Sequence, residues 1–287
     1  MAFVFKMRMT AEEAVRWYRA QPGNEEAVRA NYFDLPVLPA AQRYEVSEEF
    51  AEVRRLLGPA SGRALLDLGA GNGIASYALA CAGWKVTALE PDPSSEIGTG
   101  AIREIQRETG LPIVIEERIG DRLPFADASF YAVFARQVLH HVPDLRVTMR
   151  ELFRLLRAGG RMLALREHVA ENEEELEAFL RAHPLHHLYG QENAFPLESG
   201  YLAAAREAGF VVRQVWGGLE SILNFAPRSE SDRRNTVRWM ASQRFGLLSR
   251  ALVWMPGFVE SSLRAHTAAD RTPGRIFSFL LEKPSNS

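Results

Sequence analysis

Residues 64–74 read ALLDLGAGNGI, a short apolar run that leads into three glycines at every second position. Apolar runs of this length that end in glycine are typical of buried parallel strands. Glycine lets the chain turn sharply and lets a ligand approach the backbone without a Cβ in the way. A helix that starts at Ile74 would present free N–H groups and a partial positive charge to that ligand. The stretch therefore predicts a nucleotide-binding turn between a strand and a helix.

Similar apolar runs recur along the chain and alternate with helix-like segments. The runs cover residues 85–90, 112–117, 129–136, 160–166, 210–216 and 275–281, and helical patterns cover 74–82, 94–109, 144–157 and 197–208. Strands that alternate with helices indicate βαβ units and a parallel sheet. We therefore expect an α/β fold: a Rossmann-like, seven-stranded, mostly parallel sheet with helices on both faces.

Helical segments are also expected before and within this core. Residues 1–60 predict a helical N-terminal cap, with a capping box of Thr10 and Glu13 ahead of its first helix and a third helix over 40–57. The predicted core covers 61–220 and includes an insertion over 170–196. Residues 221–272 predict a helical insertion that forms a lid or a dimer face. For the aromatic and apolar stretch 237–259 within it, binding to a membrane surface is a third interpretation. Residues 273–287 then supply the last strand and the tail.

The composition excludes several classes of partner. The 287 residues carry 34 basic and 36 acidic side chains, a net charge of −2, which gives no global attraction to nucleic acid or anionic lipid. No run of about 18 apolar residues predicts a membrane span. Cys81 is the only cysteine, so an internal disulfide is impossible. We expect a cytoplasmic protein without a nucleic-acid partner or an integral membrane segment.

The glycine loop alone leaves two nucleotide cosubstrates open. Glu90 ends the second predicted strand, 17 residues after Gly73, where a carboxylate can accept both hydroxyls of a ribose. S-adenosylmethionine (SAM) and NAD both carry that ribose. The NAD fingerprint is G-x-G-x-x-G, whereas the glycines here are evenly spaced and position 74 is isoleucine.

Four collinear blocks decide between these cosubstrates. The glycine spacing, with Asp67 two residues before the first glycine, resembles motif I of SAM-dependent methyltransferases. The stretches GDRLPFADASF (120–130), QVLHHVPD (137–144) and RLLRAGGRML (154–163) resemble further blocks of the type-11 methyltransferase family within this class I fold. The similarity covers roughly residues 60–170. It departs from the family at Ala158, usually proline, and at Tyr131, commonly aspartate.

The resemblance implies SAM as the cosubstrate, S-adenosylhomocysteine as its product, and a set of binding residues. In the family, the position of Asp121 accepts the adenine amino group and the next residue can offer a backbone N–H. Asp67 would lie near the amino-acid portion, and Gln137 would face that portion or the acceptor. The implied cofactor site consists of Asp67, Gly69, Ala70, Gly71, Gly73, Glu90, Pro91, Asp121, Arg122 and Gln137.

Candidate catalytic residues follow from where the predicted strands end. Glu167 and His168 end the fifth strand, so they are expected beside the methyl donor. His186 is a candidate base or hydrogen-bonding group in the 170–196 insertion, which would form part of the acceptor pocket. A catalytic role of His140 or His141 is an alternative, and a structural role remains open for each histidine. The histidine spacing fits no standard zinc pattern, so we expect no metal.

The leading hypothesis is a SAM-dependent methyltransferase acting on oxygen, nitrogen or carbon of a small organic acceptor, with secondary metabolites as one candidate class. One alternative is a SAM-binding protein of this fold without catalysis. Another is an NAD-dependent oxidoreductase, which the glycine spacing and the Asp121 block disfavour. A homodimer through residues 221–272 is a further option.

Overall fold

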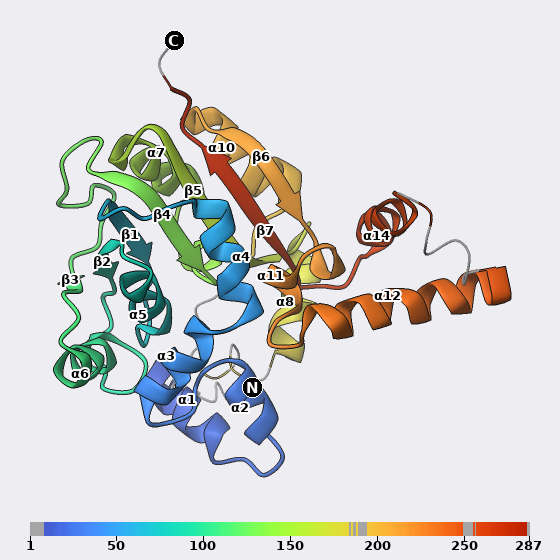
Figure 1. Cartoon of the computed structure of the whole chain (residues 1–287), viewed down its shortest axis with the longest axis horizontal. Coiled ribbons are helices and arrows are strands. Elements are labelled where there is room, and N and C mark those ends of the chain that lie inside the picture. Colours follow the sequence, from blue (N-terminus) through green and yellow to red (C-terminus); the bar gives the residue numbers. More distant parts are fainter. Residues whose placement is uncertain are drawn as a thin grey trace, which may run out of the picture.

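The computed structural model describes residues 9–183, 185, 188, 194–248, 255 and 257–285. Its centre is a single seven-stranded sheet of order β3-β2-β1-β4-β5-β7-β6 (Figure 1). The strands are β1 (Ala64–Leu68), β2 (Lys85–Leu89), β3 (Val114–Glu116), β4 (Phe130–Arg136), β5 (Leu156–Val169), β6 (Val211–Trp216) and β7 (Arg275–Glu282). The first five pair in parallel, and β7 runs antiparallel to β5 and β6. The predicted seven-stranded, mostly parallel sheet is confirmed.

Helices cover both faces of the sheet, as predicted. Alternate strand residues face opposite sides: Leu65 and Phe134 join a core cluster with helices α3 (Val37–Glu45), α4 (Glu48–Leu57), α5 (Ile74–Cys81) and α6 (Thr99–Thr109). Leu66 and Val133 join a second cluster with α7 (Leu145–Leu155), η2 (Leu197–Leu202) and α10 (Ala203–Ala208). The sheet is therefore buried on both sides, and ligands are expected at the carboxyl ends of its parallel strands.

The first N-terminal helix forms as predicted, but the third predicted helix, over 40–57, is divided in two. Thr10 caps α1 (Ala11–Arg19) with the expected capping box, and α2 (Glu25–Ala30) follows. The prediction of one helix over 40–57 is wrong, because α3 ends at Glu45 and α4 begins at Glu48. Ser47 separates them: its Oγ accepts the N–H of Phe50 at 3.1 Å, which is the hydrogen bond of an N-cap.

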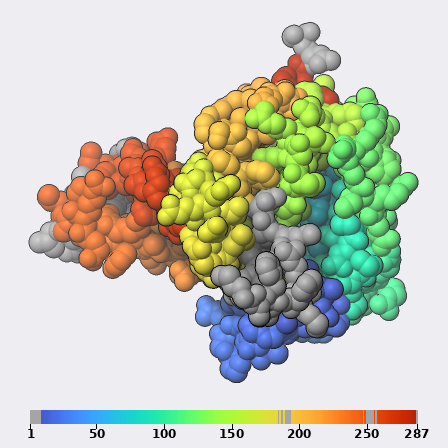
Figure 2. Space-filling view, turned by 180° about the vertical axis from the view of Figure 1, so that it is seen from behind, coloured from blue at the N-terminus to red at the C-terminus, as the bar shows by residue number. Residues whose placement is uncertain are grey.

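The insertion before the last strand projects from the body of the molecule. It contains η3 (Gly218–Glu220), α11 (Ile222–Phe225), α12 (Glu230–Phe245), η4 (Gly246–Leu248) and α14 (Phe258–Ala269). In Figure 1, α12 and α14 extend beyond the β7–β6 side of the sheet, and Figure 2 shows the same orange and red segment standing out from behind. Trp239, on α12, has an exposed fraction of 63%. No helix in the described part of the chain could cross a membrane.

Candidate functional site

The glycine loop follows β1 and adopts a backbone that needs glycine. Gly69, Gly71 and Gly73 all have positive φ angles, of 61°, 54° and 82°. A Cβ on Gly69 would lie 1.9 Å from Cγ2 of Val138, in the loop after β4. The loop therefore packs directly against the β4 end, and Gly73 forms the N-cap of α5.

Glu90 closes the loop from the neighbouring strand. Its Oε2 accepts the N–H of Gly71 at 2.8 Å, and its Oε1 accepts the N–H of Asp92 at 2.9 Å. The side chain is buried, and this burial raises the pKa of its carboxyl. Because an ionised carboxylate has about four acceptor positions, Glu90 can still accept two hydroxyl groups.

Asp67 lies beneath the loop and is almost completely buried. Its Oδ2 accepts the hydroxyl of Ser76 at 2.6 Å. Burial raises the pKa of Asp67 to about 7, in spite of this hydrogen bond. A cationic group nearby would favour the ionised carboxylate.

A cavity of about 450 Å³ opens over the loop, within the usual range for small-molecule sites. Seven of the ten predicted cofactor residues line it: Asp67, Gly69, Ala70, Gly71, Glu90, Pro91 and Gln137. Tyr18 and Phe33 line it from the N-terminal helical region. Among the described residues of the 221–272 insertion, none lines this cavity, and the lid stays a prediction.

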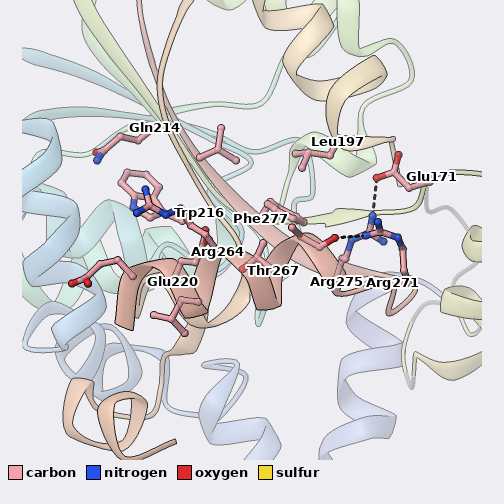
Figure 3. Close-up of a pocket in the computed structure, with 14 residues that line it drawn as sticks. Glu171, Leu197, Gln214, Trp216, Glu220, Arg264, Thr267, Arg271, Arg275 and Phe277 are labelled. Atoms are coloured by element: carbon pink, nitrogen blue, oxygen red, sulfur yellow. Dashed lines mark hydrogen bonds and ion pairs between the residues drawn. The ribbon is translucent and has the colours of Figure 1, made fainter. Parts of the chain in front are cut away.

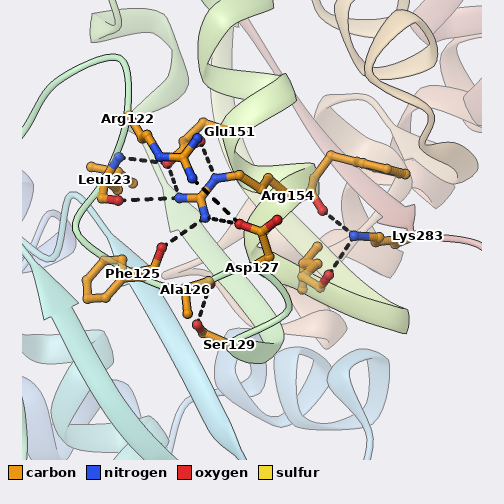
Figure 4. A network of polar contacts seen from close by, with 11 residues as sticks. Arg122, Leu123, Phe125, Ala126, Asp127, Ser129, Glu151, Arg154 and Lys283 are labelled. Carbon is orange, nitrogen blue, oxygen red and sulfur yellow. Dashed lines mark hydrogen bonds and ion pairs between the residues drawn. The ribbon is translucent and has the colours of Figure 1, made fainter.

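The two residues predicted to contact the adenine lie outside the lining of this cavity. Asp121 and Arg122 are exposed and are not among the residues that line the cavity. Their block is held instead by α7 (Figure 4): Arg154 donates to the carbonyl of Phe125 at 2.9 Å and to Asp127 at 2.6 Å. Glu151 accepts the N–H of Leu123 at 2.6 Å. Arg154 of the 154–163 block therefore binds the 120–130 block. This contact gives both the arginine and the LPF stretch a structural role.

Glu167 does not reach the cavity surface. Its carboxylate is completely buried and accepts the backbone N–H groups of Val138 and His140, each at 3.1 Å. Its Oε2 also lies 2.7 Å from Nδ1 of His140. These bonds anchor the short helix η1 (Leu139–His141) to β5. This placement favours a positioning role over direct contact with an acceptor.

His140, rather than Glu167, lines the cavity from this pair. Burial is the main cause that lowers the pKa of His140 to about 3, so the imidazole is neutral at physiological pH. When Glu167 is ionised, its contact of 2.7 Å with Nδ1 places the ring proton on Nδ1 and leaves Nε2 as the basic nitrogen. A buried carboxylate behind Nδ1 stabilises the imidazolium when Nε2 takes a proton.

His168 lies in the cavity wall, as part of an aromatic cluster. Its Nδ1 is 2.8 Å from the carbonyl oxygen of Gly274, and its ring packs 4.6 Å from Phe179 and 4.9 Å from His140. Burial lowers its pKa to about 4. His186 lies outside the described residues, so its predicted role is not located.

The sequence analysis did not predict the contact between His140 and Glu167. His140 was one of two alternatives at the end of the fourth strand, and Glu167 was assigned to the chemistry itself. The signal that joins them is the order of the sheet: β4 and β5 are neighbours, so their carboxyl ends meet. Within the described residues, no group of three or more metal-ligating side chains is arranged to hold a metal ion.

Comparison with known proteins agrees with this site. A family model described as a methyltransferase domain matches residues 66–164. The sarcosine/dimethylglycine N-methyltransferase of Halorhodospira halochloris is 32% identical over 53% of this chain and 54% of its own length. Four of the curated relatives are each matched over 38% to 59% of their length.

Two solved structures share the fold over most of the chain. Geranyl diphosphate C-methyltransferase from Streptomyces coelicolor has a TM-score of 0.56 and 15% identity, covering 95% of this chain and 98% of that one. The cyclase SpnF has a TM-score of 0.54 and 17% identity, covering 86% and 82%. Together with the matched domain, the strand order and the glycine loop closed by Glu90, these similarities show that residues 66–164 form a methyltransferase domain of the class I SAM-dependent type.

Proposed function

We propose that this chain transfers a methyl group from SAM to oxygen, nitrogen or carbon of a small organic acceptor. One observation carries the proposal: the glycine loop, Glu90 and His140 line the same cavity of about 450 Å³. A cosubstrate-binding loop and a base therefore share one cavity. SAM supplies the electrophilic methyl group on its sulfonium; the chain supplies binding, orientation and a proton acceptor.

The residues around the loop fit SAM. Glu90 retains acceptor capacity for the two ribose hydroxyls after binding the Gly71 and Asp92 amides. Asp67 offers a buried carboxylate that an ammonium or sulfonium group would stabilise in its ionised form. The bare backbone of Gly69 and Gly71 allows close approach of the amino-acid portion. Asp121 and Arg122 remain predicted adenine contacts.

The acceptor side favours a nucleophile that must lose a proton. Glu167 holds His140 at the cavity wall, so its Nε2 is placed to take the proton of a hydroxyl or an amine as the new bond forms. Because its pKa is lowered to about 3, this base serves a proton that becomes acidic as the methyl group is transferred. Holding the nucleophile in line beside the methyl group supplies the rest of the catalysis. In this proposal Glu167 is a positioning residue, His168 shapes the wall, and His186 stays a candidate.

The names of relatives support a small acceptor. Besides the sarcosine/dimethylglycine enzyme, the matches include 27-O-demethylrifamycin SV methyltransferase of Amycolatopsis mediterranei and ubiquinone biosynthesis O-methyltransferases. These names describe methylation of amines and hydroxyls on organic molecules. A homodimer and a cytoplasmic location remain predictions.

A second candidate is a protein of this fold that binds SAM without transferring its methyl group. The fold shared with the cyclase SpnF favours it, since that similarity connects the same architecture with another reaction. The intact loop, Glu90 and the His140–Glu167 pair favour methyl transfer.

Calorimetric titration of the chain with SAM, S-adenosylhomocysteine and NAD tests the proposal first. We expect both sulfur compounds to bind and NAD not to bind; NAD binding without SAM binding would refute it. A screen for transfer of labelled methyl to metabolite fractions follows. Binding of SAM with no labelled acceptor would favour the non-catalytic candidate.

A further inference from the structure

Two arginines lie at adjacent strand ends beside the proposed site. Arg136 ends β4, and its register partner on β5 is Leu165, the residue before Arg166. Arg166 sits in an irregularity of β5, where pairing with β7 shifts between Ala164 and Glu167. Its φ angle is +59°, a conformation that non-glycine residues rarely adopt. Such strained positions cluster at functional sites.

The two guanidinium groups are unequally satisfied. Arg136 forms an ion pair with the buried Glu49, with its Nε 2.7 Å from Oε1. Arg166 donates from Nη1 to the carbonyl of Ala226 at 2.6 Å, but its buried Nε has no hydrogen-bond partner. Arg166 therefore keeps an unsatisfied donor and has only an uncharged backbone partner.

The charges around Arg166 do not balance. Arg136 repels it, Glu49 attracts it, and Tyr32 and Tyr44 are its other electrostatic neighbours. Burial raises the pKa of both tyrosines, so they are neutral. Arginine stays charged in proteins. Of the described side chains that act most strongly on Arg166, Glu49 is the acid, and it faces the positive charges of both Arg136 and Arg166.

Arg136 brings this charge to the wall of the reaction site, and Arg166 lies behind it and lines neither of two neighbouring cavities. Arg136 lines the 450 Å³ cavity together with Gln137 and His140. A second cavity of about 440 Å³ is lined by Tyr32, Glu49 and Ala226, the neighbours of Arg166. The Arg136–Glu49 pair connects the walls of the two cavities.

Another cavity of the molecule shows the ordinary arrangement. The cavity of about 730 Å³ between α14 and the β6–β7 edge also contains arginines (Figure 3). There Arg275 lies 2.7 Å from Glu171 and 3.2 Å from Glu175, so its charge is neutralised within the chain. Arg166 has no such acid to itself. A buried charge without a counter-ion is costly, which makes an external anion favourable at Arg166.

We infer that the methyl acceptor carries an oxyanion, a carboxylate or a phosphate, which binds at Arg136 in the cavity wall, with Arg166 adding the second positive charge behind it, while the acceptor's nucleophile faces His140. Arginine forms charge-assisted and often bidentate hydrogen bonds with both groups. The inference rests on the proposed function, because it names the acceptor class of that site.

Matched ligand pairs test the charge requirement on the unmodified chain saturated with S-adenosylhomocysteine. Calorimetry would compare benzoate with benzamide, and phenyl phosphate with phenol. We expect at least one anion to bind about tenfold or more tighter than its neutral counterpart, the effect of one hydrogen bond to a charged group. Whether benzoate or phenyl phosphate shows the preference identifies the oxyanion. Equal affinities within both pairs would overturn the inference.

Two arginine variants locate the effect. Arg166→Met should weaken binding of the preferred anion about tenfold to 100-fold and leave its neutral counterpart unchanged. Arg161→Met is the matched control, since Arg161 lies on the same strand and also donates to a backbone carbonyl, that of Leu56 at 2.7 Å. The control should keep the anion preference. An Arg166→Met variant that also keeps it would contradict the assignment.

Thermal unfolding separates anion binding from a structural role. Without an anion, Arg166→Met should unfold at the same or a higher temperature, because a poorly compensated buried charge is removed. A strong destabilisation would assign Arg166 to the fold instead. If Arg166→Met does not fold, the selectivity of the unmodified chain and the variant Arg166→Lys decide.

The outcomes also separate this inference from the proposed function. If SAM and S-adenosylhomocysteine bind but no anion preference exists, the inference alone fails. If neither sulfur compound binds, the proposed function fails, and the matched pairs then measure the arginine site by itself.

Discussion

Glu90 and Glu167 are two buried glutamates near the carboxyl ends of β2 and β5, strands of one sheet that β1 and β4 separate, and they have different roles. Each accepts two backbone N–H groups from a loop beside it. Glu90 also lines the cavity, whereas Glu167 lies behind His140 and contacts its ring. One carboxylate can therefore meet a ligand directly, and the other can act only through an imidazole.

The difference teaches that the position of an acid at a strand end does not settle its role. Glu90 follows the end of β2, next to a glycine loop whose backbone leaves room for a ligand. Glu167 lies within β5, and the η1 segment fills the space in front of it. The two carboxylates differ because His140 lies between Glu167 and the cavity, whereas Glu90 lines the cavity itself.

The largest effect is expected for His140→Ala, which removes the group between Glu167 and the cavity. Loss of a positioned base lowers turnover by about 10²- to 10⁴-fold. Affinity for SAM should change little, because His140 is not assigned to its binding. Single-turnover methyl transfer to an acceptor found by label transfer measures the first quantity, and calorimetry the second.

His141→Ala is the neighbouring control. His141 also lines the cavity, with its ring 4.2 Å from that of His140, and it acts on Glu167 electrostatically, whereas Nδ1 of His140 lies 2.7 Å from that carboxylate. We expect a loss of turnover below about tenfold, the lower end for a group outside the proton transfer. Equal losses in the two variants would remove the special role of His140.

The next effect is expected for Glu90→Ala, on binding instead of turnover. Loss of the carboxylate should weaken SAM by about 1–3 kcal/mol, because hydrogen bonds to the cosubstrate and the loop both disappear. Turnover at saturating SAM should fall much less. An unchanged dissociation constant in calorimetry would show that Glu90 does not contact the cosubstrate.

Glu167→Gln should have a smaller effect than Glu90→Ala, and on turnover instead of SAM affinity. The amide keeps the size of the side chain but cannot stabilise a protonated His140 with a negative charge. We expect turnover to fall by about tenfold, roughly 1.4 kcal/mol, with SAM affinity unchanged. The pH profile of single turnover should move relative to the unmodified chain. An unaltered rate and profile would reduce Glu167 to a support for η1.

A third buried carboxylate, Asp67, is expected to affect the pH dependence of stability and not the turnover. Its pKa is raised from 3.8 to about 7, so the folded chain holds a proton that the unfolded chain releases. Its contribution to stability is complete below about pH 4 and is lost as pH rises to about 7. The slope is about 1.4 kcal/mol per pH unit. Urea denaturation of Asp67→Asn should show a stability curve without this decline; parallel curves would contradict the raised pKa.

The sequence predicted the sheet and the cosubstrate loop well because local patterns determine them. The seven apolar runs became the seven strands, and Gly69 and Gly71 line the cavity as expected. The break between α3 and α4 was missed, because one capping hydrogen bond of Ser47 outweighed a continuous helical pattern. Helix propensity is a weak guide where a good cap is available.

The acceptor side could not be predicted because it depends on contacts between distant residues. Glu167 and His140 are 27 positions apart, and Arg136 meets Glu49 across 87 positions. No periodicity reports such pairs. The exposure of Asp121 likewise depends on how α7 holds the block around it.

A crystal structure with S-adenosylhomocysteine tests the central claim most directly. We predict the ligand in the 450 Å³ cavity, with its ribose hydroxyls within hydrogen-bond distance of Glu90 and its sulfur facing Gln137 and His140. The account would be contradicted by a ligand bound elsewhere, or by one in this cavity that leaves Glu90 without contact and turns its sulfur away from His140.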